Sequence, residues 1–241
     1  LVGSEMCIRD RYQSRLAKAI DMHFAGRMIN SPNDYDVVIK LIPTKNDNFF
    51  VCMRLCSIQD NRFAYRKNVL PTSMHPSQAA LIVSLAKPYL KETAQIMDPF
   101  CGVGTLLIER AHLVPAREIY ATDTYGDAIT MGRENAAFAK TRINFIHRDF
   151  FDFRHDYKFD ELITDMPVRN RQTKAEMELF YERFFDKAAE HLVSGGIIVM
   201  YSNEIGFVKK QIRLRVEYRL LQETCILDKK DFYLFVIRYE D

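Results

Sequence analysis

The strongest constraint on the fold is an alternation of short apolar runs and longer amphipathic segments between residues 77 and 201. The short runs predict β-strands and the longer segments predict helices. Parallel strands need crossovers of helix length, and such crossovers cover both faces of a sheet. The pattern therefore predicts an α/β fold, Rossmann-like, around a mostly parallel sheet.

The expected elements follow one another with little chain between them. The strands are predicted at Gln95–Met97, Ile119–Thr122, Ile143–Ile146, Glu161–Thr164 and Ile197–Tyr201. The helices are predicted at Ala79–Leu90 (with Ser77 as N-cap), Thr105–Leu113, Gly126–Ala139 and Ala175–Leu192, and Ser194-Gly195-Gly196 is predicted to be a turn. The last two β-rich runs, Tyr218–Leu227 and Phe232–Tyr239, are joined by a short polar turn and predict an antiparallel hairpin.

The part before residue 72 has a different character. A weakly helical pattern over residues 12–30 is followed by two β-branched and aromatic runs, Asp36–Ile42 and Phe49–Leu55, joined by a polar loop. Arg62–Ser73 has no clear period and is interpreted as a linker. We therefore expect a small N-terminal α+β segment over 12–71 and a larger domain over 72–241.

The first eleven residues are set aside from functional reasoning. The chain opens with Leu1, and Met6–Arg11 resembles a translated sequencing adapter, so residues 1–11 are interpreted as non-native. On this interpretation the natural protein extends further upstream.

Composition narrows the functional classes. The 34 Lys and Arg against 32 Asp and Glu leave a formal charge of +2, so any nucleic-acid surface must be local. The apolar run Ala79–Ala86, interrupted by Ser84, is far shorter than the roughly 20 residues of a membrane-spanning helix. The five cysteines are odd in number and never spaced as C-x-x-C, which favours neither disulfides nor a metal site. We expect a cytoplasmic protein with no metal and no membrane contact.

The most informative segment is Asp98-Pro99-Phe100-Cys101-Gly102-Val103-Gly104-Thr105, which leads from a predicted strand into a helix. Glycines allow a ligand to approach the backbone closely, and a helix N-terminus offers free N–H groups to an anion. Leu107 stands where a dinucleotide fingerprint needs its third glycine, and no Gly-Lys-Ser/Thr phosphate loop follows. A nucleotide-redox function is therefore disfavoured.

Two further acidic residues follow the next two strands. Asp123 lies 21 residues beyond Gly102, near the spacing expected for a carboxylate that binds ribose hydroxyls. Asp149 follows the third strand, where it could accept an adenine amino proton while Phe150 forms an apolar wall. Since the carboxyl ends of parallel strands line the ligand crevice, Asp98, Asp123 and Asp149 are expected to converge there.

The larger predicted domain resembles a known family. Residues 72–240 resemble the class I S-adenosylmethionine (SAM)-dependent methyltransferases, and the octapeptide at 98–105 is similar to the D-P-F-C-G-[ST]-G-T signature of the THUMP-associated RNA methylases. The resemblance implies SAM at the strand ends, contacted by Asp98, Phe100, Gly102, Gly104, Thr105, Asp123, Asp149 and Phe150. Thr72–Pro76 is similar to the family's segment that closes over the cofactor. The N-terminal segment would then be the tail of an RNA-binding region.

Thr164-Asp165-Met166-Pro167-Val168 lies where amino-group methyltransferases carry [DNS]-P-P-[YFW]. An exocyclic amine conjugated to a base ring is a poor nucleophile. A carboxylate or amide oxygen that accepts its N–H bonds keeps the nitrogen lone pair aimed at the methyl group, and positioning supplies much of the rate. Asp165 is the candidate acceptor and Pro167 the candidate rigid element of the turn; a structural cap is the alternative role for Asp165.

The turn departs from the pattern at two positions. Met166 replaces the first proline, and Val168 replaces the aromatic residue that stacks on the extruded base. Val168 remains a candidate substrate contact, but a stacking platform would have to come from Phe100 or Tyr201, or be absent. Loss of catalysis with retention of SAM binding is therefore one alternative.

Basic residues after this turn are candidates for contact with a nucleic-acid backbone. Arg169 and Arg171, with Lys174, could neutralise phosphates or could simply form a solvated loop. A second basic run between Lys209 and Arg219 is interpreted as an exposed helix face. The expected function is SAM-dependent methylation of a base amino group in RNA, guanine N2 of tRNA or ribosomal RNA. DNA adenine, a small molecule, or an inactive SAM- or RNA-binding module are the alternatives.

Overall fold

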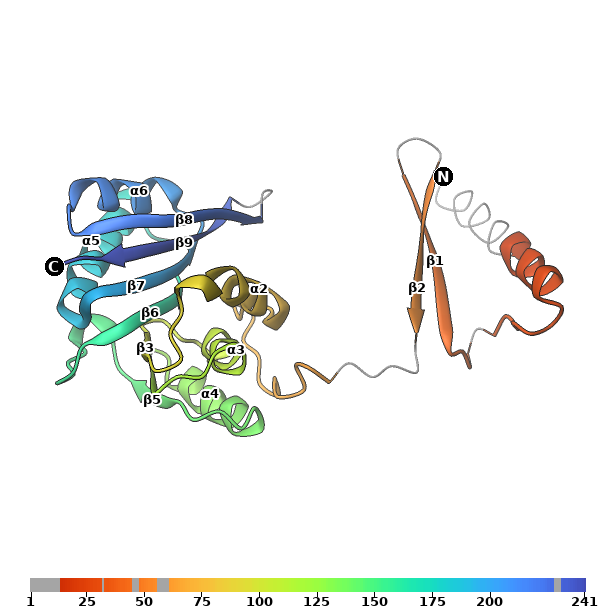
Figure 1. The fold of residues 1–241 in the computed structure, drawn as a ribbon, viewed down its shortest axis with the longest axis horizontal. Helices are drawn as coiled ribbons and strands as arrows, with labels where there is room; N and C mark the ends of the chain where they lie inside the picture. Colours follow the sequence, from red (N-terminus) through yellow and green to blue (C-terminus); the bar gives the residue numbers. More distant parts are fainter. Residues whose placement is uncertain (1–13, 32, 45–47, 56–60, 228–230) are drawn as a thin grey trace. The chain divides into compact units, whose positions relative to one another are not determined.

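The computed structural model describes residues 14–31, 33–44, 48–55, 61–227 and 231–241 (Figure 1). The chain divides into two compact units, Leu1–Asn61 and Arg62–Asp241. The division falls ten residues before the boundary predicted at 71/72. The segment 1–11, interpreted as adapter-derived, lies outside the described residues.

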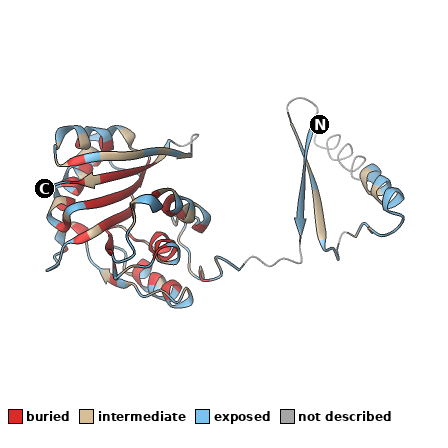
Figure 2. Ribbon diagram, viewed as in Figure 1, coloured by how far each residue is buried: buried red, intermediate tan, exposed pale blue. Residues whose placement is uncertain are grey.

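The smaller unit contains a helix and a hairpin. Residues 14–24 are helical, and the helix stops there because Ala25 and Gly26 adopt φ of 50° and 77°, so the pattern expected to residue 30 is not continued. Strands β1 (Val37–Pro43) and β2 (Phe49–Leu55) pair antiparallel, as predicted. All seven residues of β2 are exposed (Figure 2).

The larger unit is built on a seven-stranded sheet with the order β5-β4-β3-β6-β7-β9-β8. Its strands are β3 (Gln95–Asp98), β4 (Glu118–Asp123), β5 (Asn144–His147), β6 (Phe159–Asp165), β7 (Leu192–Ser202), β8 (Tyr218–Leu227) and β9 (Phe232–Tyr239). The pairs from β5 to β7 are parallel, and β9 is antiparallel to both of its neighbours. The predicted α/β class and the mostly parallel sheet are confirmed.

The C-terminal hairpin has the predicted bounds but an unpredicted position. Strand β9 lies between β7 and β8, pairing with β7 from Ile197↔Arg238 to Ser202↔Tyr233 and with β8 on its other side. A hairpin pattern in the sequence predicts that two strands pair with each other. It does not predict which of the two pairs with the rest of the sheet.

Helices cover both faces of this sheet. Helices α2 (Pro76–Ala86), α3 (Thr105–Leu113) and α4 (Gly126–Phe138) pack on one face, and α5 (Lys174–His191) and α6 (Ile205–Leu214) on the other. Successive strand residues point to opposite faces, so Ile96 joins the first core cluster and Met97 the second. The buried strands between the two helix layers are evident in Figure 2.

The segment predicted as a linker before α2 is part of the folded unit. Tyr65 is 5% exposed and its hydroxyl donates to Glu109 of α3. The buried side chain of Asn135 in α4 accepts from the backbone N–H groups of Lys67 (3.0 Å) and Asn68 (2.9 Å) and donates to the Asn68 carbonyl (2.9 Å). These bonds fix the chain at the approach to α2.

Two local predictions need correction. The N-cap of α2 is His75, whose Nδ1 accepts from the Ser77 N–H, and the helix begins at Pro76, a residue favoured in the first turn. Ser194-Gly195-Gly196 lies within β7, where Phe159↔Leu192 and Glu161↔Ile197 leave extra residues as a bulge.

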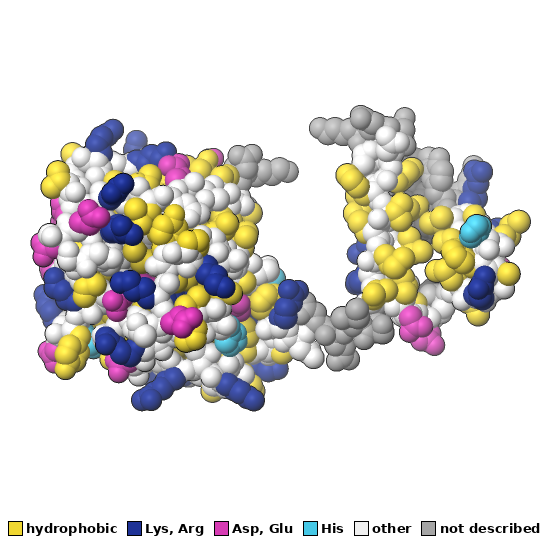
Figure 3. Space-filling view, viewed as in Figure 1, with side chains coloured by type: hydrophobic (Ala, Val, Ile, Leu, Met, Phe, Trp, Pro, Cys, Tyr) yellow, Lys and Arg dark blue, Asp and Glu magenta, His cyan; other side chains and the backbone are white. Residues whose placement is uncertain are grey.

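The second basic run is not one helix face. Lys209, Lys210 and Arg213 are exposed on α6, whereas Arg215 follows the helix and bonds Asp186. Arg219 is on β8. Figure 3 shows basic and acidic side chains interspersed over the visible face of the larger unit, as the near-zero net charge predicts.

Within the described ranges, no helix combines the length and apolarity that crossing a bilayer demands. The same residues contain no cluster of three or more His, Cys, Asp or Glu side chains placed to hold a metal ion.

Candidate active site

The site lies at the carboxyl ends of β3 and β6, where the strand order reverses. From β3 the chain proceeds outward through β4 and β5, then returns to β6 on the other side of β3. Such a switch point leaves a crevice between neighbouring strand ends. The β3–α3 turn forms one wall of this crevice and the segment after β6 forms another.

The glycine turn between β3 and α3 is closed by a backbone bond from the Gly104 N–H to the Cys101 carbonyl at 2.8 Å. Gly102 and Gly104 have φ of 49° and 79°, in the left-handed region that favours glycine. A Cβ on Gly104 would lie 2.7 Å from a ring atom of Phe145, so this position also needs the absence of a side chain. Gly104 thus permits close packing of α3 against β5, and it does not line the cavity.

Asp123 at the end of β4 holds this turn in place. Its Oδ2 accepts the Gly102 N–H at 2.8 Å, and its Oδ1 accepts the Tyr125 N–H at 2.9 Å. A carboxylate oxygen can accept more than one hydrogen bond, so each oxygen retains acceptor capacity. Asp123 is half-buried and lines the cavity. It can therefore order the turn and accept ligand hydroxyls at the same time.

Asp98 at the end of β3 is buried beneath the turn. Only 1% of it is exposed, and its Oδ1 accepts the Phe100 N–H at 3.0 Å. Burial, reinforced by the negative charges of Asp165 and Asp123, raises the pKa of Asp98 to about 8. Its main observed contact is with its own turn, which makes it a positioning residue.

Asp165 ends β6 on the other side of the crevice. The backbone continues the ladder beyond it, because the Met166 N–H donates to the Tyr201 carbonyl at 2.9 Å. Burial raises the pKa of the Asp165 carboxyl to about 7. The group is therefore close to half-ionised near neutral pH, which is unusual for an aspartate.

These elements enclose a cavity of about 560 Å³, within the usual range for small-molecule and cofactor sites. Nine of the predicted site residues line it: Asp98, Phe100, Gly102, Thr105, Asp123, Asp165, Pro167, Val168 and Arg169. The Leu70–Met74 region closes another side, with Arg66 Nη2 donating to the Met74 carbonyl at 3.1 Å. One cavity therefore joins the predicted cofactor turn and the predicted catalytic turn.

Four predicted site residues are placed elsewhere. Phe150 is 1% exposed and packs in the core behind Phe100, with ring centroids 5.9 Å apart, so it offers no free wall to a ligand. Asp149 caps the short 3-10 helix Phe150–Asp152 by accepting the Phe151 N–H at 2.9 Å. Gly104 and Arg171 also do not line the cavity.

Of the two candidate rings for a stacking platform, only Phe100 faces the cavity. Tyr201 is 3% exposed, stacks on Phe232 at 4.8 Å and accepts a hydrogen bond from Gln78 at 2.6 Å. Val168 is 52% exposed, so the usual aromatic position of the turn carries only a small apolar side chain. Arg169 lies 3.7 Å from Glu204.

No direct sequence signal marks the residues that hold the Leu70–Met74 wall. Arg66 bonds the Met74 carbonyl eight residues further on, and Asn135 bonds the backbone of Lys67 and Asn68 from 68 and 67 residues away. The one available hint is an asparagine on the apolar face of α4, since a buried amide needs partners.

The cavity has features that fit a SAM molecule. The hydroxyl of Thr105 at the N-terminus of α3 is buried and has no hydrogen-bond partner among the described residues. Together with the free N–H groups of the first helical turn, it can bind the carboxylate of a methionine moiety. Asp123 has acceptor capacity for ribose hydroxyls, and Phe100 supplies an apolar ring.

The strand order, the glycine turn and the acidic strand ends together define a class I SAM-dependent methyltransferase domain. Residues 64–224 match the family model described as RMKL-like, methyltransferase domain (UPF0020). The chain belongs to this family, whose cofactor is SAM. The resemblance drawn from the octapeptide is confirmed at this level.

Known relatives agree with the assignment. The chain is 32% identical over 187 residues to a tRNA (guanine(10)-N2)-dimethyltransferase of Methanothermobacter thermautotrophicus, covering 73% of this chain and 54% of that protein. It is 25% identical over 155 residues to the release factor glutamine methyltransferase of Lactococcus lactis, covering 56% of each. The chain thus spans about half the length of these curated relatives.

Solved structures share the fold. TrmN from Thermus thermophilus matches 94% of this chain and 66% of its own, with a TM-score of 0.71 and 19% identity. Trm5 from Methanocaldococcus jannaschii, in complex with adenosine, matches 70% of this chain and 51% of its own, with a TM-score of 0.54 and 19% identity.

Proposed function

We propose that the chain is the catalytic domain of a methyltransferase that transfers the methyl group of SAM to an exocyclic amino group of RNA, guanine N2 of tRNA. The observation that carries this proposal is the position of Asp165 in the same cavity as the glycine turn. The similarity to a tRNA guanine-N2 enzyme supports the choice of base and of RNA.

The bound cofactor supplies an electrophilic methyl group on a sulfonium. Asp165 accepts an N–H of the base amine, and its β6 position orients the nitrogen lone pair toward the cofactor part of the cavity. With the cofactor bound, its S–C bond would break as the amine nitrogen takes the methyl group, and the Asp165 carboxylate or water would accept the proton that the amine loses. Pro167 restricts the turn that carries this acceptor.

We propose the following cofactor contacts, which the geometry of the cavity supports. Thr105 and the first turn of α3 bind the methionine carboxylate, Gly102 allows close approach, and Asp123 binds the ribose. Asp149 remains a proposed adenine contact through its second carboxylate oxygen, since Oδ1 accepts the Phe151 N–H. Gly104 and Phe150 would support the cofactor site by packing behind the cavity. For the substrate we propose that Val168, Arg169 and Arg171 line the approach of the RNA.

We also propose that the smaller unit is the end of an upstream RNA-binding region, which the methyltransferase domain follows, and that the protein acts in the cytoplasm on tRNA. An isolated two-stranded hairpin is marginally stable in water. Apolar side chains of β2, such as Phe50 and Met53, are exposed. This exposure supports a neighbouring part of the RNA-binding region that packs against the hairpin.

Purified protein with labelled SAM tests the proposal against its alternatives. We expect label in tRNA, absent from DNA and from a metabolite extract. Label in DNA or metabolites instead would identify a different methyl acceptor. SAM binding by calorimetry without transfer to any pool would mean that the Val168 turn is inactive and would reject catalysis.

A further inference from the structure

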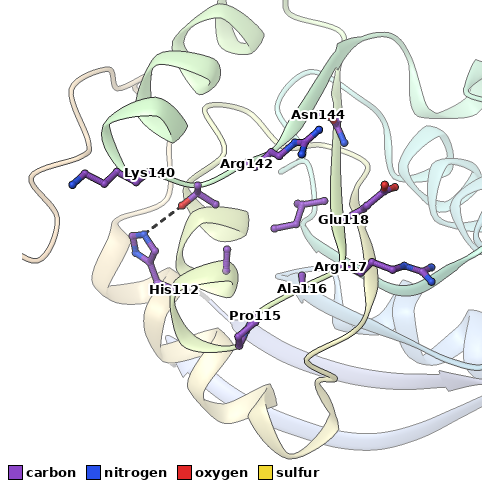
Figure 4. Close-up of a pocket in the computed structure, with 11 residues that line it drawn as sticks. His112, Pro115, Ala116, Arg117, Glu118, Lys140, Arg142 and Asn144 are labelled. Carbon is purple, nitrogen blue, oxygen red and sulfur yellow. Dashed lines mark hydrogen bonds between the residues drawn. The ribbon is translucent and has the colours of Figure 1, made fainter.

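A second cavity, of about 410 Å³, lies at the amino ends of β4 and β5. The proposed active site lies at the carboxyl ends of the strands. It is formed by the end of α3, the start of β4 and the connection from α4 to β5 (Figure 4). Polar side chains dominate its rim, including His112, Arg117, Glu118, Lys140, Arg142 and Asn144.

The charges around this cavity are unbalanced. Three cations, Arg117, Lys140 and Arg142, line this cavity with a single acid, Glu118, and the Lys140 and Arg117 side chains extend outward from its rim (Figure 4). Glu118 accepts a bond from the Tyr120 hydroxyl at 2.7 Å. Among the described residues, none of the three cations pairs with a carboxylate; Arg117 donates to the neutral Gln95 amide at 2.8 Å. Uncompensated guanidinium and ammonium donors around a concave surface favour an anion.

Lys140 occupies a position that favours glycine. Its φ is 55°, and the following Thr141 N–H donates to the Ala136 carbonyl at 2.9 Å, which ends α4. A lysine in this left-handed conformation costs about 1 kcal/mol relative to glycine. The dipole of a helix stabilises cations near its C-terminus. This effect does not explain Arg117 and Arg142, which lie outside α3 and α4, shortly before β4 and β5.

We propose that this cavity binds a backbone phosphate of the RNA substrate. The proposal rests on the proposed function, because that function supplies the RNA. Arg142 provides the bidentate donor, with Lys140 and Arg117 adding charge. Strand β4 runs from Glu118 at this cavity to Asp123 at the proposed active site, a separation of about 17 Å that folded RNA spans readily. The site would orient the RNA and leave the chemistry unchanged.

The test compares Arg142→Ala with Arg213→Ala, which removes another exposed arginine, from α6, and changes net charge identically. Binding of unfractionated tRNA is measured across salt concentrations, together with SAM affinity. We expect Arg142→Ala to weaken tRNA binding several-fold at low salt and to reduce the slope of log K against log salt by about 0.7–0.9, the value of one phosphate contact. Arg213→Ala should leave the slope unchanged, and both variants should bind SAM normally.

Lys140→Gly separates binding from stability. It should raise the melting temperature, because the backbone strain disappears, while weakening tRNA binding. In methyl transfer, both Lys140→Gly and Arg142→Ala should raise KM for tRNA and leave kcat unchanged.

Equal tRNA binding by Arg142→Ala and Arg213→Ala would overturn the proposal. A second result would also overturn it. In calorimetry, inorganic phosphate would bind the wild type and not Arg142→Ala, while Arg142→Ala would bind tRNA as tightly as the control Arg213→Ala. The cavity would then be a site for free phosphate. In both cases methyl transfer to tRNA by the wild type would leave the proposed function standing. A wild type that binds no tRNA would overturn both.

Discussion

Replacing Asp165 by asparagine should remove a pH dependence while preserving the reaction. Burial raises the pKa of Asp165 to about 7. With that pKa, about 9% of the carboxyl is ionised at pH 6 and about 91% at pH 8. In the ionised carboxylate, either oxygen can accept the amine N–H. If full activity needs this ionised form, kcat/KM of the wild type should rise about tenfold over this range.

Asp165→Asn keeps a carbonyl oxygen at the end of β6 and does not titrate. We therefore expect a flat profile between pH 6 and 8, with activity at pH 6 comparable to that of the wild type. The measurement is the initial rate of transfer from labelled SAM to tRNA at limiting SAM, where kcat/KM reports the free enzyme. At saturating SAM the wild-type inflection should move to lower pH, because a sulfonium favours nearby ionised carboxylates.

Asp152→Asn is the matched control, since Asp152 is exposed on the 3-10 helix outside the cavity, and it should retain the wild-type profile. An unchanged inflection in Asp165→Asn would refute the reasoning and assign the ionisation to another group, such as Asp98. Loss of activity at every pH with intact SAM binding would also refute it, because a negative charge rather than an acceptor would then be required.

Three further predictions concern the turn and its supports. Asp123→Ala should weaken SAM binding by about 1–3 kcal/mol in calorimetry, because ribose hydroxyls and the turn lose an acceptor; unchanged affinity would place the ribose elsewhere. Gly104→Ala should lower the free energy of unfolding by about 2–4 kcal/mol through φ strain and contact with Phe145, whereas Gly206→Ala, with open space around it, should be neutral or stabilising in the same denaturant titration. Asn135→Ala should cost about 1–3 kcal/mol and speed tryptic cleavage in the segment before α2; equal cleavage rates would show that its bonds do not hold that segment.

Local patterns were sufficient to predict most elements of the larger unit. The bounds of α3 agree with the prediction, as do those of β8 and β9, because each has a clear period bounded by turn residues. The carboxyl ends of parallel strands must share an edge, and for this reason the order of strands and helices along the chain is enough to place Asp98 and Asp123 together.

The failures share a physical cause, which is dependence on distant partners. The stretch Arg62–Ser73 has no period because its order comes from Glu109 and Asn135, far along the chain. Phe150 was expected to face a ligand, yet its ring fills the space between Phe100 and α5. An aromatic side chain at a strand end can contact a ligand or pack in the core, and only the tertiary structure decides which of these it does.

The interleaved position of β9 has a consequence for synthesis on the ribosome. When β8 has emerged and β9 has not, β7 has an open edge and β8 has no strand to pair with. Such edges are sites of intermolecular pairing. The β7–β9 and β9–β8 pairings can form only after Phe232–Tyr239 has been translated, so nascent chains stalled in that interval are exposed to aggregation through these edges.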